Sequence, residues 1–445
     1  MLGIGSVRER IRESLWFWPL ISIALSSGLG AVLTTTRPLA DSGPFGVLVD
    51  LDVSQVHAIT ATLVGAMITA ASIISSLTIV ALQTASTQYS PRLLRNFVRD
   101  TTTQVTFATF LGTAAYLIAV FVCVGDESPQ LALTLAMAAL LASLVAVAIF
   151  FNHVSQSIRI ETIIRQVATE TLEAADRLAE WLGGADTSFE AFDPSPDSAV
   201  AIEADRSGYV QQIDVGALAQ ISARRGVDIW IAPQLGQWIM EGTTIAWCAP
   251  SGHAHDDDAA SFATTVASAA GSICDQVEIG YERTMHHDVA LGIRQLVDIA
   301  NKAMSPAVND PYTAMQSIDH LGPILAGLGR GPVGDHIVTG PDGHGWVAVP
   351  GASLMDFAAL ATDQIRRVGA REPAVALRLL DMIGDVVQVV DVEYHDGLCD
   401  LARRVLDDAR RRTANPDDLS EVEATAAVVV AAHDAVRHRA RRNGL

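Results

Sequence analysis

Long apolar stretches fill the first third of the chain. Four of them, at about residues 15–33, 58–82, 105–124 and 131–151, approach or exceed the roughly 20 residues that a helix needs to cross a bilayer. The loop at 125–130 is too short for anything but an antiparallel hairpin of the last two. The pattern predicts an α-helical integral membrane protein with four transmembrane helices in residues 1–155.

The second stretch carries polar residues along one face of a helix expected over residues 55–90, about 54 Å long at 1.5 Å per residue. Steps of three and four keep positions on one helical face. Because polar groups in hydrocarbon seek partners, we expect this face to meet another helix or water. These positions are called the polar seam: Thr62, Gly65, Thr69, Ser72, Ser76, Ile79, Gln83, Ser86 and Ser90.

The hydrophobic pattern changes after residue 155. Residues 156–196 predict an amphipathic helix leaving the membrane, followed by an acidic linker. Short glycine-punctuated strands over 197–250 predict a small β-barrel or sandwich. Residues 258–445 read as mainly helical, with a short β-hairpin near 336–350. The fold expected after the spans is therefore a soluble α+β domain, made of a small β-barrel or sandwich and a helical bundle.

Charge is distributed as unevenly as hydropathy. The formal net charge is -20, yet residues 1–155 hold seven arginines against eight acidic residues. The acidic remainder argues against nucleic-acid binding, which needs clustered cations. Arginines concentrate in the segment before the first span and in the loop after the second. Segments rich in arginine stay on the cytoplasmic side of the membrane. We expect a multi-pass protein of the inner (plasma) membrane with both termini cytoplasmic.

One candidate site lies at residues 278–288. Glu278, Glu282 and His286 recur at helical spacing, and Arg283 and Asp288 lie beside them. Two carboxylates and an imidazole on one helical face could hold a divalent ion. A buried salt-bridge network with Arg283, or plain exposed charge, would use the same residues. Whether any metal binds stays open.

A second candidate lies at residues 302–314, where two prolines interrupt a helical pattern. Asn309 or Asp310 can cap a helix starting at Pro311. The open amides there could instead bind an anion, with Lys302 nearby. The GxSxG, HExxH and GxxxxGK[ST] patterns are absent, so no catalytic residue is assigned. We expect neither an enzyme nor a cofactor.

Several segments resemble a known family: SSLTIVALQTASTQYSPRLLRNF at 75–97, FLGT at 110–113, ERT at 282–284 and LVDIANKAMSPAVNDPYTA at 296–314. They look like a bacterial membrane-protein family catalogued as domain of unknown function 2254. The resemblance covers nearly the whole chain and implies a four-span N-terminal region with a large C-terminal soluble domain. It implies no activity.

Three functions remain open. The first is an oligomeric channel or passive pore for ions or small solutes, a homo-oligomer in the lipid bilayer, lined by the polar seam and regulated by the cytoplasmic domain. Ile79, the one large apolar seam position, could gate it by dewetting. The second is a membrane-anchored sensor or scaffold whose cytoplasmic domain binds a small ligand or a protein. The third is a membrane-bound enzyme using Glu278, Glu282 and His286.

Overall fold

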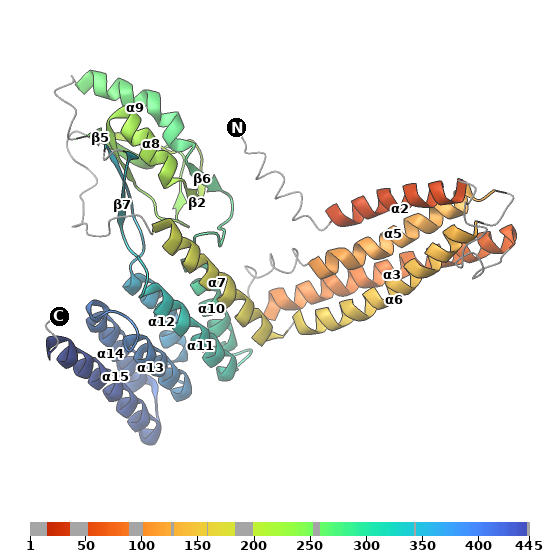
Figure 1. The fold of residues 1–445 in the computed structure, drawn as a ribbon. Coiled ribbons are helices and arrows are strands. Elements are labelled where there is room, and N and C mark those ends of the chain that lie inside the picture. Colours follow the sequence, from red (N-terminus) through yellow and green to blue (C-terminus); the bar gives the residue numbers. More distant parts are fainter. Residues whose placement is uncertain are drawn as a thin grey trace. The chain divides into compact units, whose positions relative to one another are not determined.

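The computed structural model describes residues 16–35, 52–88, 101–125, 129–157, 159–182, 199–251, 259–341 and 344–442. Contacts divide the chain into two compact units, Met1–Thr162 and Ile163–Leu445, here called the N-terminal and C-terminal units. Figure 1 shows the helices and strands of both. Each unit has a hydrophobic core made only of its own residues.

The N-terminal unit confirms the four predicted apolar helices. Among the described residues, four helices are long and apolar enough to cross a membrane. Helix α5 is the central one. In its most apolar segment 50% of the residues are buried, whereas the share in the other three helices is 11–22%. The helices are α2 (Phe17–Thr35), α3 (Val53–Gln88), α5 (Thr101–Cys123) and α6 (Gln130–Ser157).

Close backbone approach and a few hydrogen bonds join these helices. A Cβ atom at Gly30 of α2 would lie 2.9 Å from both Ala119 Cβ and the Tyr116 carbonyl oxygen of α5. Ser22 Oγ donates to the Ala108 carbonyl at 2.7 Å, and Tyr116 Oη donates to the Ala132 carbonyl of α6 at 2.8 Å. Small residues and hydroxyls commonly join helices in membranes. They account here for the packing around α5.

Helix α7 (Ile160–Leu182) begins three residues after α6 ends. It matches the predicted amphipathic helix, and its buried face includes Ile163, Ile164 and Val167. A Cβ atom at Gly292 would overlap Thr171 of α7. Helix α7 therefore packs tightly against the helix that carries Gly292.

The strands of the C-terminal unit form two open sheets within the part of the chain that the structure describes. The first is mixed, in the order β1-β5-β3-β8-β7, and the second is antiparallel, β4-β2-β6. No closed barrel is present among the described strands. The strands are β1 (Val200–Glu203), β2 (Gly208–Ile213), β3 (Val227–Ile231), β4 (Trp238–Ile239), β5 (Thr244–Pro250), β6 (Val277–Gly280), β7 (His336–Thr339) and β8 (Trp346–Val349).

The predicted hairpin near 336–350 exists, and it extends the first sheet. Strands β7 and β8 pair antiparallel, with His336 opposite Val349. Strand β8 also pairs with β3 in parallel, placing Ile229 beside Val347. Helices α8 (Val215–Arg225) and α9 (Ala259–Cys274) pack with the strands in one core. The hairpin and the glycine-punctuated region therefore share a sheet.

Helices make up most of the remaining C-terminal unit (Figure 1). Ser353 and Asp356 form a capping box at the start of α12, which satisfies otherwise unpaired amides. The helices are α10 (Val289–Ala303), α11 (Pro311–Leu328), α12 (Leu354–Gly369), α13 (Pro373–Val387), α14 (His395–Arg412) and α15 (Pro416–Arg442), with the short 3-10 helix η3 (Val392–Tyr394) before α14.

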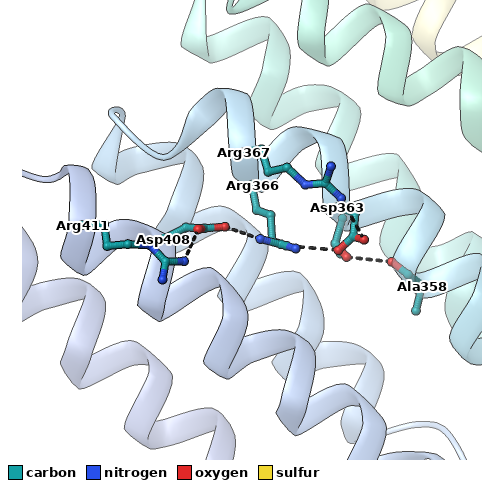
Figure 2. A network of polar contacts seen from close by, with 7 residues as sticks. Ala358, Asp363, Arg366, Arg367, Asp408 and Arg411 are labelled. Carbon is teal, nitrogen blue, oxygen red and sulfur yellow. Dashed lines mark hydrogen bonds and ion pairs between the residues drawn. The ribbon is translucent and has the colours of Figure 1, made fainter.

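An ion-pair network ties α12 to α14 (Figure 2). Arg366 of α12 bridges Asp363, at 3.1 Å, and Asp408 of α14. Arg411 and Arg367 hold the outer ends of the network. Burial of Asp408 alone would raise its pKa, but hydrogen bonds from Arg411 and Arg366 outweigh that and lower it. Three arginines face two aspartates, so every carboxylate is paired and the network fixes how α12 packs on α14.

Candidate functional site

The described members of the polar seam lie on the exposed side of α3. Ile79 is 63% exposed, and every other seam position from Thr62 to Gln83 is also exposed. The opposite side of the helix, with Met67, Ala71 and Ile74, is buried in the core of the N-terminal unit. The side chain of Ser86, and all of Ser90, lie outside the described residues. The helices that the structure describes therefore leave this part of the polar seam uncovered.

Hydroxyl groups of the polar seam bond to their own helix. Thr62, Thr69 and Ser72 donate to the carbonyls of Ala58, Gly65 and Ile68, at 2.8 to 2.9 Å. Such bonds to the preceding turn are common for Ser and Thr. They satisfy the donors, so placing these hydroxyls in hydrocarbon costs less free energy than placing unpaired hydroxyls there.

The prediction that residues 278–288 form one helical face is wrong. Glu278 lies on strand β6, whereas Glu282 and His286 lie in the turns between β6 and α10. Val277 and Ile279 alternate with Glu278 and Gly280, a period of two that produces a strand. All three candidate ligands are exposed. Among the described residues, no group of three or more His, Cys, Asp or Glu side chains is placed to hold a metal ion.

Two neighbours of that set form a tight ion pair instead. Arg283 Nε and Nη2 donate to the two carboxylate oxygens of Asp288, each at 2.7 Å. Asp288 is only 4% exposed and also accepts from the Leu291 amide, capping α10. The pair lies against Gly236, whose φ of +75° is suited to glycine. Planar bidentate pairing is strong and directional, so this part of the candidate site fixes the start of α10.

The second candidate, at residues 302–314, forms the connection between α10 and α11. Asp310 accepts from the Thr313 amide at 3.1 Å and from its hydroxyl at 2.7 Å, confirming the predicted cap. Asn309 has a φ of +52°, a conformation that asparagine tolerates better than most residues. Lys302 is exposed in the last turn of α10. The Asp310 side chain occupies the amide that an anion would otherwise use.

Sequence reasoning missed a cluster of aromatic rings at the end of α7. The indole of Trp181 stacks on His287, with ring centroids 5.8 Å apart, and meets His336 of β7 edge-on at 4.9 Å. Arg177, one turn earlier in α7, donates to the His286 carbonyl at 2.8 Å. The histidines are separated by about fifty residues of sequence, so only the aromatic residue on an amphipathic helix could have drawn attention to the cluster.

The architecture defines a class: a protein with four apolar helices long enough to span a membrane, followed by a mixed α/β region. The family model described as "Predicted membrane protein (DUF2254)" matches residues 12–385. The chain therefore belongs to this family, as its motifs indicated.

Relatives of this chain are known in mycobacteria. Uncharacterized proteins of Mycobacterium bovis and Mycobacterium tuberculosis (strain H37Rv) are each 32% identical over 439 residues, covering 95% of this chain and 81% of the relative. A third, from M. tuberculosis strain CDC 1551, matches to the same extent. No solved structure matches significantly.

Proposed function

We propose that the chain forms an oligomeric membrane channel or passive pore for ions or small solutes. Copies assemble around an axis in the inner membrane, and each contributes the polar seam of α3 to the lining. The C-terminal unit lies in the cytoplasm and regulates opening. Ile79 supplies a ring of apolar side chains that empties of water in the closed state.

The observation that carries the proposal is the exposure of the polar seam. Its described positions point away from α5, while the buried side of α3 packs within the unit. This face carries hydroxyls along most of a span, and the described helices leave it uncovered. Such a face suits an assembly around water. Helix α3 has 36 residues and so extends to about 54 Å, enough to line the full thickness of a bilayer.

Charge supports the orientation within this proposal. Three arginines precede the first span, and Arg92, Arg95 and Arg99 follow the second. Positive residues are retained on the cytoplasmic side, which supports a cytoplasmic location for the acidic C-terminal unit too. An acidic domain beside a pore raises the local concentration of cations. These arginines are not among the residues that the structure describes.

The second candidate function is a membrane-anchored sensor or scaffold. It is favoured by the hydrogen bonds from Thr62, Thr69 and Ser72 to their own helix. With these donors satisfied, the polar seam can lie against lipid or a neighbouring helix at little cost, and no conduit is then needed. In this case the C-terminal unit binds a ligand or partner and the spans only hold it at the membrane.

Ion flux through the full chain in liposomes separates the two functions. In a pore, Ile79→Ser removes the apolar ring, and we expect a severalfold increase in ion conductance. Ile73→Ser is the matched control: Ile73 is 57% exposed on the same helix, 120° around the axis from Ile79. Its substitution should leave conductance unchanged.

Two results would contradict the pore. One is equal conductance for the wild type, the Ile79→Ser variant and the Ile73→Ser control. The other is a monomer in mild detergent and in lipid nanodiscs, measured by mass photometry. Either result would favour the membrane-anchored sensor or scaffold over the pore.

A further inference from the structure

The end of α7 is joined to the rest of the C-terminal unit by three rings, two of which are imidazoles that can take up a proton. Trp181 is in contact with two histidines from different segments, His287 from the turns before α10 and His336 from β7. His286 lies beside His287, with ring centroids 4.4 Å apart. Trp181 thus joins helix, loop and sheet at one place, and two of its partners are titratable.

His336 is held in its neutral form by its surroundings. It is only 3% exposed, and its Nδ1 lies 3.3 Å from the Gly334 carbonyl oxygen. A carbonyl oxygen can only accept, so Nδ1 carries the proton. Among the described residues, Nε2 is buried without a hydrogen-bond partner. Burial lowers the pKa of His336, and the Gly334 carbonyl and Asp335 only partly oppose this.

His287 is also disfavoured as a cation. Burial lowers its pKa to about 4, and the neighbouring His286 and Arg177 contribute in the same direction. Arg177 stays close because it donates to the His286 carbonyl and pairs with Glu173 at 3.7 Å. Protonation of His287 would therefore place a positive charge beside that of Arg177, in a partly buried position next to Trp181.

We propose that Trp181, His287 and His336 form a proton-sensitive clasp, which holds the C-terminal end of α7 against the rest of the C-terminal unit at neutral pH and releases it on acidification. The proposal does not depend on pore activity. It concerns the helix that directly follows the last apolar span, so release changes how firmly the chain after that span is anchored to its own domain.

The direction of the pH effect follows from the two states. In the released state the histidines meet water and have the ordinary pKa of about 6.5. In the clasped state the pKa of His287 is about 4. A group whose pKa is lowered by folding binds protons more readily when released. The clasp is therefore fully stable above pH 6.5 and weakens progressively as the pH falls towards 4.

Amide hydrogen exchange on the full chain in lipid nanodiscs tests the clasp. After correction for intrinsic exchange, we expect residues 178–182 and 285–288 to exchange about tenfold faster at pH 5 than at pH 7.5. Helix α14 serves as an internal reference and should keep its protection. The variant with His287→Gln and His336→Gln should lose most of the pH response, because neither side chain then titrates.

His320→Gln, a substitution of another histidine on α11, is the matched control and should behave as the wild type. If the double variant does not fold, His287→Gln alone makes the same comparison. The proposal is overturned if wild-type residues 178–182 show no pH dependence beyond intrinsic exchange. It is also overturned if the variants respond like the wild type, or if α14 loses protection in parallel with α7.

Discussion

At the scale of single residues, the clearest constraint is the glycine that packs on the Arg283–Asp288 pair. Gly236 has a φ of +75°, and a Cβ atom there would overlap Asp288 Oδ2 and lie 2.6 Å from Arg283 Nη2. The pair cannot move aside freely, because Asp288 also caps α10. One position thus combines a backbone requirement with a steric one.

Gly236→Ala should destabilise the protein by about 2–4 kcal/mol, since it adds overlap with a buried ion pair to the cost of a left-handed alanine. Gly242→Ala is the matched control. Gly242 has a φ of +80° but nothing within 4 Å of a built Cβ, so only the backbone cost, about 1 kcal/mol, applies. Thermal unfolding of the two variants measures the difference in stability. Equal losses of stability would show that the ion pair moves aside without cost.

At the scale of elements, the sequence predicted what depends on local pattern. The four apolar helices follow from length and composition, and the short strands expected over residues 197–250 are present there as β1 to β5. Strand β6 was missed because it is only four residues long between two helices. That error created the supposed metal face at residues 278–288, since Glu278 and His286 were placed on a helix that does not exist.

Long-range placement could not be predicted. Parallel pairing of β8 with β3 and the contact of Trp181 with His336 join segments more than a hundred residues apart. No local pattern records which distant strand or ring will be the partner. The exposure of the polar seam was likewise open, because the same hydroxyl spacing suits a buried helix contact.

The approach of α2 to α5 gives a prediction at this scale. Gly30→Ala should weaken their packing by about 1–3 kcal/mol, because its Cβ would press on Ala119 and on the Tyr116 backbone, which cannot rotate away. Gly28→Ala, on the same helix with nothing within 4 Å, should be neutral or slightly stabilising. Thermal stability of the purified chain in detergent provides the measurement. Comparable losses in both variants would contradict close packing at Gly30.

At the scale of the whole molecule, the two units have separate cores. The core clusters of the N-terminal and C-terminal units share no residue, and the network of Asp363, Arg366 and Asp408 lies entirely in the C-terminal unit (Figure 2). Domains with their own cores can fold alone. We therefore expect the C-terminal unit to fold without the N-terminal unit, which can be measured.

A fragment of residues 160–445 should fold in aqueous buffer without detergent and unfold cooperatively on heating. A shorter fragment, residues 199–445, removes α7 and exposes the surfaces that Ile163, Ile164 and Val167 cover. We expect its midpoint of unfolding to fall by several degrees, or the fragment to aggregate. Circular dichroism and size-exclusion chromatography make the comparison. Equal stability of the two fragments would show that α7 is not part of the fold.

Because β3 pairs with β8, one edge of β3 stays unpaired during synthesis until β8 has been made. Val227–Ile231 leaves the ribosome more than a hundred residues before Trp346–Val349, a delay on the order of ten seconds at ordinary translation rates. Throughout that interval one side of β3 is an open template for strands of other chains. A nascent polypeptide that stalls before Trp346 is therefore an aggregation hazard, and cells that make this protein have reason to shield it with a chaperone until the hairpin arrives.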